Sequence, residues 1–424
     1  MSKFQLAVMG ILTLSIVGGL VSFSLFSSSK DDSLPGNTNG RVVIWGVYDS
    51  GVMNALIRSV SDEYEAFSVQ YVQKRADRFD TELIEALASG VGPDVVLLQQ
   101  DSLMRHYDKL YAVPYESFSE RAFKDTYIQA GEMYLASNGV VGFPFLVDPL
   151  VMFWNRSIFN SEALARPPTV WEEFQDLSRT MTRLDASRNV TRATVALGEY
   201  ENITNAKQIL ATLFFQSGNP ISRVTSQGLT SVLSEENSIA SPLQFYTGFA
   251  DPVRPFYTWN RSLPASRNGF IAGDIALYFG FGSEIRGIRT QNPNLNFDIA
   301  VMPQPMESSN RVTFGNVQAL SILRSTRNFS GAFVAVQMLT SKSVMEQLAN
   351  VSNLPPVRRD MYVTQTDSFK SVLYESALIS KAWLDPDRTQ TSSIFSELIG
   401  NITSGRLRTD EAVRRADSLI DSLY

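Results

Sequence analysis

Apolar and polar positions alternate in two different periods at the start of the body of this chain. Residues 41–47 (RVVIWGV), 69–73 and 94–98 form short β-branched or alternating runs typical of strands. Residues 52–67 and 79–88 carry apolar residues at helical spacing. The resulting order is β-α-β-α-β, which predicts mostly parallel strands with helices on their faces.

The rest of the chain continues to mix strands and helices. We expect strands at 140–143 and 151–154, separated through Pro144 and Pro149, because proline interrupts a strand ladder. Amphipathic patterns predict helices at 171–181, 205–215, 331–339 and 409–423. Strands or short helix–strand pieces are expected at 270–279, 297–302 and 319–323. The fold class is therefore α/β.

A long apolar run lies near the N-terminus. Residues 6–26 contain no charged side chain, and a helix of that length would cross a bilayer core of about 30 Å. Lys3 precedes the run, so the bias of positive charge places the N-terminus inside and the body outside. We expect residues 1–30 to form a cytoplasmic stub and transmembrane anchor, and 31–40 a flexible tether. A cleaved signal peptide is the alternative.

Composition excludes several classes of protein. The chain has 424 residues, 44% hydrophobic and 19% charged, which suits two globular domains. Its net charge is −6, so nucleic acid is not an expected partner. There is no cysteine and a single histidine, His106, so disulfides, thiol chemistry and Cys- or His-based metal sites are not expected.

No local motif points to catalysis or to a cofactor. Adjacent acids such as Glu172 and Glu173 diverge on a helix, so they cannot share a substrate. Phosphate-binding, nucleophile-elbow and zinc-protease motifs are missing from the sequence. We expect no enzyme activity, no cofactor and no metal ion.

Five segments and a late pair of segments, in order, resemble the family 1 extracellular solute-binding proteins of bacterial ABC importers, the group that includes the maltose-binding protein. They are VVIWGVYDSG, ELIEALASGVGPDVVLLQQDSL, GVVGFPFLVDPLVMFWNRSIF, PPTVWEEFQDLSRTMT, FIAGDIALYFGFGSE, and the late pair SNLPPVRRD and SGRLRTDEAVRRADSLI. The sequence departs from many members in lacking a lipid-anchor cysteine, and it has Phe281 where sugar-binding members often have Trp.

The resemblance implies a periplasmic-binding-protein-like architecture of two lobes joined by three hinge crossings. Carried over, the crossings fall near 145–150, 302–304 and 354–357. The N-terminal lobe would then comprise 41–146 with 305–353. The C-terminal lobe would comprise 150–301 with 358–424.

Solute contacts are expected in the cleft between the lobes. Asp101 follows a predicted buried strand, where α/β sheets place ligand groups. Asp148 lies in the first crossing, in an apolar stretch where an unpaired buried carboxylate would be costly. The positions that match the family's contacts, or border them, are Trp45, Asp49, Asp101, Asp148, Asn202, Asn205, Trp259, Phe281 and Trp383. For Trp45 and Trp259, core packing is an equal alternative.

The resemblance implies a monomeric receptor that binds a small solute by hinge closure and delivers it to ABC permease subunits. Acidic and aromatic cleft residues favour a sugar or oligosaccharide, although polyamines also fit. The alternatives are a membrane-tethered sensory or adhesion ectodomain of the same fold and a carbohydrate-active cleft enzyme.

Overall fold

The alternation predicted for the start of the body is present in the computed structural model. Strand β1 (Val42–Gly46) pairs in parallel with both β2 (Val69–Gln73) and β3 (Val95–Gln99). Helices α2 (Ser50–Ser61) and α3 (Phe79–Ala88) make the connections. Because the strands are parallel, the carboxyl ends of β1 and β3 meet at one edge of the sheet, and the loops there can reach a ligand.

The structure describes residues 41–61, 68–226, 228–235, 239–307, 310–363 and 365–424. The apolar run at 6–26 and the tether at 31–40 lie outside these residues, so the expectation of a membrane anchor falls on a part that is not described. Among the described residues, no helix combines the length and the apolar character needed to cross a bilayer.

The two short strands predicted around the prolines are wrong in their bounds. One long strand, β6 (Phe143–Asn155), runs through both Pro144 and Pro149. Its first half pairs only with β13 (Thr313–Ile322), and its second half pairs with β11 (Ile275–Phe281) and β12 (Phe297–Val301). Both prolines fall in the half with a single neighbour, where a missing N–H need not interrupt a ladder.

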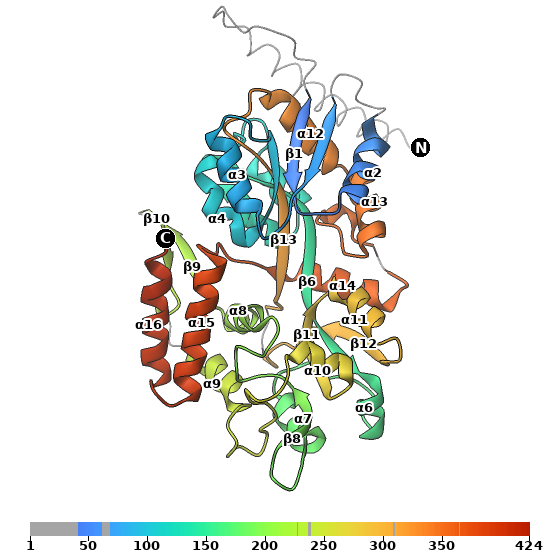
Figure 1. Cartoon of the computed structure of the whole chain (residues 1–424), viewed down its shortest axis with the longest axis vertical. Helices are drawn as coiled ribbons and strands as arrows, with labels where there is room; N and C mark the ends of the chain where they lie inside the picture. The colour runs from blue at the N-terminus through green and yellow to red at the C-terminus, as the bar shows by residue number, and fades with distance from the viewer. Residues whose placement is uncertain (1–40, 62–67, 227, 236–238, 308–309, 364) are drawn as a thin grey trace, which may run out of the picture.

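The expectation of mostly parallel sheets also needs correction. One mixed sheet of ten strands extends through the molecule, in the order β2-β1-β3-β13-β6-β11-β8-β7 with β12 and β14 beside β6 and β13. Strand β13 is antiparallel to both β3 and β6. Strands β6 and β13, which we call the crossing strands, run lengthwise from one lobe to the other (Figure 1).

The remaining elements complete the lobes around this sheet. The N-terminal lobe adds the following: α4 (Leu103–His106), α5 (Glu120–Thr126), β4 (Leu135–Ala136), β5 (Gly139–Val140), α12 (Phe329–Leu339) and α13 (Lys342–Ser352). The C-terminal lobe adds α6 (Arg156–Ser161), α7 (Glu173–Met181), β7 (Arg183–Leu184), β8 (Val190–Val195), α8 (Ala206–Gln216), β9 (Ser222–Thr225), β10 (Gly228–Ser231), α9 (Ala240–Gly248), α10 (Ser266–Ala272), α11 (Glu284–Gln291), α14 (Ser368–Leu378), β14 (Ser380–Lys381), α15 (Arg388–Thr403) and α16 (Thr409–Asp421).

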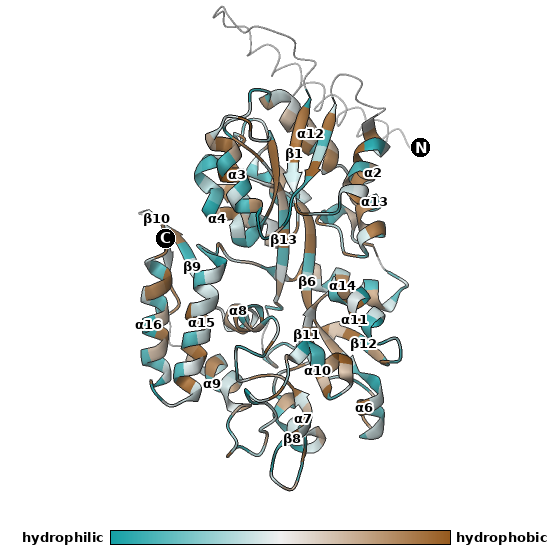
Figure 2. Ribbon diagram, viewed as in Figure 1, coloured by the Kyte–Doolittle hydropathy of each residue, from teal (hydrophilic) through white to brown (hydrophobic). Residues whose placement is uncertain are grey.

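Each lobe has its own apolar core. One cluster gathers buried side chains from 42–147, 317–357 and Ala377. The other gathers them from 150–302, 312–314 and 373–420. Hydrophobic residues concentrate on the strands, while the helices show both hydrophobic and hydrophilic faces (Figure 2). Two separate cores that are joined by the crossing strands leave room for a cleft between them.

Candidate functional site

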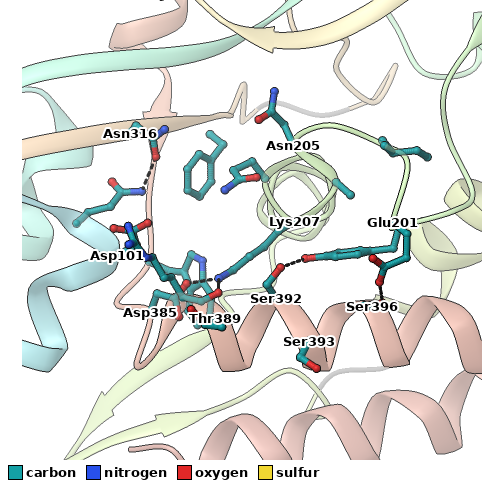
Figure 3. A pocket seen from close by; sticks show the side chains of 18 residues that line it. Asp101, Glu201, Asn205, Lys207, Asn316, Asp385, Thr389, Ser392, Ser393 and Ser396 are labelled. Atoms are coloured by element: carbon teal, nitrogen blue, oxygen red, sulfur yellow. Dashed lines mark hydrogen bonds and ion pairs between the residues drawn. The ribbon is translucent and has the colours of Figure 1, made fainter. Parts of the chain in front are cut away.

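A cavity of about 710 Å³ lies between the lobes beside helices α8 and α15. We call it the α8–α15 chamber (Figure 3). The N-terminal lobe contributes the turn after β3, the C-terminal lobe contributes both helices, and β13 forms part of the wall. Its lining residues are Gln100, Asp101, Tyr200, Glu201, Ile203, Asn205, Ala206, Lys207, Gln208, Phe314, Asn316, Trp383, Asp385, Arg388, Thr389, Ser392, Ser393 and Ser396.

A fully bonded lysine stiffens one side of this chamber. Lys207 reaches from the first turn of α8 to the segment before α15 (Figure 3). Its ammonium forms an ion pair with Asp385 and donates to Thr391 Oγ1 at 2.5 Å and to the carbonyl of Arg388 at 3.3 Å. The side chains of Lys207 and Asp385 are 10% and 4% exposed. All three N–H groups of the ammonium are therefore used within the protein.

Asp101 enters the same chamber from the opposite lobe. It follows the carboxyl end of β3, and burial raises the pKa of its carboxyl, with Arg388 opposing and Asp385 reinforcing that shift. Among the described residues, Ser102 Oγ alone donates to this carboxyl, through a long hydrogen bond of 3.5 Å. Asp101 therefore retains capacity to bond a polar solute.

A second cavity, of about 740 Å³, lies between the lobes beside helices α11 and α14. We call it the α11–α14 chamber. Its lining residues are Tyr48, Gln99, Gln100, Leu146, Asp148, Phe281, Gly282, Ser283, Ile285, Arg286, Arg289, Thr290, Asn316, Val317, Gln318, Val351, Ser352, Asn353, Leu354, Asp367, Phe369, Lys370 and Leu373.

The two chambers meet at a pair of amides. Gln100 and Asn316 line both, and Gln100 Nε2 donates to Asn316 Oδ1 at 3.4 Å. Gln100 Oε1 also accepts from the backbone N–H of Val317 at 2.9 Å, which fixes its side chain against β13. The chambers are therefore two parts of one cleft that share these amides as a common wall.

Asp148 is an acid of the α11–α14 chamber whose pKa is shifted by its surroundings. It lies on β6 opposite Asn316, and its Oδ1 accepts from the backbone N–H of Ser283 at 3.1 Å. Burial raises the pKa of Asp148 to about 7, although the bond from Ser283 pulls it the other way. Near neutral pH this carboxyl can therefore act as a donor or as an acceptor.

An ion pair joins α4 of the N-terminal lobe to the start of α15. Arg105, on α4, bonds Asp387 Oδ2 at 2.5 Å and Asp80 Oδ2 at 2.9 Å. Asp387 caps α15 by accepting from the N–H groups of Thr389 and Gln390. Among the ion pairs of the described residues, this is the one that links the N-terminal lobe to the helix pair α15–α16.

The structure brings five of the residues predicted for the site into the cleft. Asp101, Asn205 and Trp383 line the α8–α15 chamber. Asp148 and Phe281 line the α11–α14 chamber.

The other four predicted residues line neither chamber. Trp45 lies on β1 with the ammonium of Lys74 at 3.7 Å from its ring centre, and Asp49 caps α2 by accepting from the N–H of Val52. Trp259 is buried inside the C-terminal lobe, where its Nε1 donates to Asn202 Oδ1 at 3.0 Å.

The sequence reasoning missed most of the cleft's charged and amide groups. Gln100 and Tyr48 stand next to predicted positions, so the loops after β1 and β3 could have indicated them. Lys207 and Asp385 are 178 residues apart in the sequence, so no local pattern predicts their contact. Arg286, Arg289 and Lys370 read as surface cations of amphipathic helices.

Within the described ranges, no cluster of three or more His, Asp or Glu side chains is arranged to hold an ion.

A family model described as bacterial extracellular solute-binding protein matches residues 57–371 of this chain. A protein of Brucella abortus (strain 2308), described as a binding protein, is 18% identical over 349 residues, 80% of this chain and 81% of that protein.

Solved structures share the fold at low identity. A cyclo/maltodextrin-binding protein in complex with maltotetraose has a TM-score of 0.74 at 12% identity, covering 92% of this chain and 98% of its own. The cyclic alpha-maltosyl-1,6-maltose binding protein of Arthrobacter globiformis has a TM-score of 0.74 at 13% identity, covering 91% and 98%. An ABC transporter solute-binding protein of Thermotoga lettingae, bound with α-D-tagatose, has a TM-score of 0.63 at 18% identity, covering 90% and 99%.

Proposed function

This chain belongs to the family of bacterial extracellular solute-binding proteins, and we propose from that premise that it is a carbohydrate receptor of an ABC import system. Membership in an extracellular family assigns its body to the extracytoplasmic side. The observation that carries the carbohydrate proposal is the composition of the cleft. Carboxyl, amide and hydroxyl groups stand beside Trp383 and Phe281, which suits the polar edges and apolar faces of a sugar.

The size of the cleft favours more than one sugar ring. Chambers of about 710 and 740 Å³ share Gln100 and Asn316, so a single ligand could occupy both. The similar proteins of known structure that hold maltotetraose and tagatose support a saccharide as the class of solute. We propose an oligosaccharide rather than a monosaccharide.

The proposed mechanism is closure of the lobes over the solute. A solute that contacts Asp101 from one lobe and the α8–α15 residues from the other binds best when the lobes are together. Lobe boundaries of 41–146 with 305–353 and 150–301 with 358–424 are part of this proposal. Two separate apolar cores support the division into two lobes, although 312–314 and Ala377 each pack in the core of the other lobe.

The proposal extends to the setting of the protein. Residues 6–26 would anchor a monomer to the membrane beside ABC permease subunits, with 31–40 as the tether. The solute would leave unchanged, so the protein would not be an enzyme. Incubation with the bound saccharide and chromatography of the products tests that point.

A thermal-shift screen of saccharides, polyamines and amino acids tests the proposal directly. We expect an oligosaccharide to raise the melting temperature, because ligand at a hundredfold excess over Kd stabilises the folded state by about 2.7 kcal/mol. Stabilisation by polyamines or amino acids, and by no saccharide, would show the carbohydrate assignment to be wrong.

A further inference from the structure

The α11–α14 chamber has an unusual balance of charge. Its lining includes three cationic side chains, Arg286, Arg289 and Lys370, and two acids, Asp148 and Asp367. Asp367 caps α14 by accepting from the backbone N–H of Lys370 at 2.8 Å. Asp148, with its raised pKa of about 7, carries only part of a negative charge near neutral pH. The chamber is therefore electropositive.

The cations face one cavity from two helices. Arg286, Arg289 and Thr290 stand at spacings of three and four along α11, so they share one side of that helix, and all three line the chamber. Lys370 lies in the first turn of α14 and lines the same cavity. Arg289 also stacks on the ring of Phe369, with its guanidinium carbon 4.4 Å from the ring centre. That contact orients the planar group.

These cations make no ion pair with a carboxylate of the described residues. Within the described part of the chain, no ion pair of up to 4.0 Å involves Arg286, Arg289 or Lys370. In the other chamber, Lys207 is paired with Asp385, whereas Arg388 makes no ion pair within the described residues. Three uncompensated cations around a cavity suit a ligand with its own negative charge, and Arg matches a carboxylate through two parallel hydrogen bonds.

We propose that the α11–α14 chamber binds a carboxylate of the solute, so that the protein's ligand is an acidic oligosaccharide containing a uronic acid. This inference rests on the proposed carbohydrate function. The carboxylate takes the place of the missing counter-charge between α11 and α14, and the neutral part of the chain extends past Gln100 and Asn316 into the α8–α15 chamber.

Matched ligands test the inference. Isothermal titration calorimetry compares uronate oligosaccharides of two to four units, built from galacturonate, glucuronate or mannuronate, with the neutral oligosaccharides of the same linkage. We expect at least one uronate to bind more tightly than its neutral counterpart. Its affinity should fall when NaCl is raised from 20 mM to 500 mM, because salt screens exposed charges.

Three variants connect that affinity to the chamber. Arg286→Gln and Lys370→Gln each remove one cation, and each should weaken uronate binding about tenfold or more, the usual loss for one charge-assisted hydrogen bond. Neutral saccharides should lose little. Arg121→Gln is the control, since Arg121 lies on α5 and is exposed and outside both chambers.

The outcomes separate this inference from the proposed function. Uronate binding that these two variants weaken, and the control does not, supports the inference. If neutral saccharides bind as tightly as uronates, or if the variants bind uronates like the wild type, the inference is wrong while the carbohydrate function stands. If no saccharide of either kind binds at millimolar concentration, both are wrong.

Discussion

The two chambers of the cleft are similar in size, but the lysines that line them, Lys207 and Lys370, differ in their bonding. In the α8–α15 chamber, the ammonium of Lys207 donates hydrogen bonds to Asp385, to Thr391 and to a backbone carbonyl. In the α11–α14 chamber, the cations make no ion pair within the described part of the chain, and burial raises the pKa of Asp148 to about 7. A charge that is already paired holds the wall in place. A charge without a partner remains available to the solute.

Replacing one lysine in each chamber should give the largest difference in folding stability between the two chambers. We expect Lys207→Met to lower the free energy of unfolding by about 3–5 kcal/mol, because it leaves Asp385 buried without its counter-charge. Lys370→Met should cost less than about 1 kcal/mol, since no ion pair is lost. Urea unfolding followed by circular dichroism measures both. Equal losses would mean that Lys207 and Lys370 are structurally equivalent.

The pH dependence of stability should distinguish the acid of the α11–α14 chamber. The folded state raises the pKa of Asp148 from 3.8 to about 7, so between these values the folded chain binds more protons than the unfolded chain. The contribution of Asp148 to the free energy of unfolding is therefore largest below pH 4 and is lost as the pH rises through 7. From pH 5 to pH 8, the wild type should lose about 2–3 kcal/mol relative to Asp148→Asn.

Urea titrations of both proteins at four pH values measure that difference. Asn keeps an oxygen that can accept from the Ser283 N–H, so the fold should persist. If the difference in free energy of unfolding between the two proteins stays constant with pH, the folded protein does not raise the pKa of Asp148 and the prediction is wrong.

Solute affinity should depend on acids in both chambers. Asp101→Ala and Asp148→Ala should each weaken binding of the identified saccharide by about 1–3 kcal/mol, the cost of a lost hydrogen bond to a charged or strongly polar group. Calorimetry measures the affinity, and Asp125→Ala on α5 serves as an exposed control outside the cleft. If the affinity is unchanged, these acids do not contact the solute. If the melting temperature of the variants falls by many degrees, their role is structural.

Local order could be predicted from the sequence better than the cleft. Strand β2 and helix α3 have the bounds that their patterns predict, because period and length are properties of a few consecutive residues. Strand β6 was divided wrongly at its prolines, because tolerance of proline depends on which side of the strand has a neighbour.

The contents of the cleft were harder to predict for a similar reason. Asp101 and Asp148 could be selected as ends of strands or as charges in an apolar stretch. Trp259 and Asn202 came from the resemblance alone, and they contact each other inside a lobe rather than in a chamber. The pairing of Lys207 with Asp385 arises only when α8 meets the start of α15, so no single segment encodes it.

The smallest expected effect concerns the ion pair that ties the lobes at the edge of the α8–α15 chamber. Arg105 and Asp387 are 39% and 18% exposed, so water screens their attraction, and a pair of this kind contributes about 1 kcal/mol. Burial tends to raise the pKa of Asp387, but the N–H of Gln390 and the side chain of Arg105 hold it below its usual value, so the pair persists at neutral pH. If it favours the closed arrangement, Asp387→Asn should shift the ratio of closed to open molecules about fivefold.

Spin labels can measure that shift without a solute. The sequence has no cysteine, so Glu85→Cys on α3 and Ser418→Cys on α16 would carry the only two labels. Asn still caps α15, so the variant removes the charge and preserves the helix start. Pulsed electron paramagnetic resonance measures the distance between the two labels, and we expect it to be longer in Asp387→Asn than in the wild type. In 1 M NaCl the label distance of the wild type should increase toward that of the variant, because salt screens the ion pair. The control Asp410→Asn breaks ion pairs with Arg408 and Arg414 at the start of α16 and should change nothing. Identical distances in all three proteins would show that the crossing strands alone set the separation of the lobes, and that the two chambers open and close without this contact.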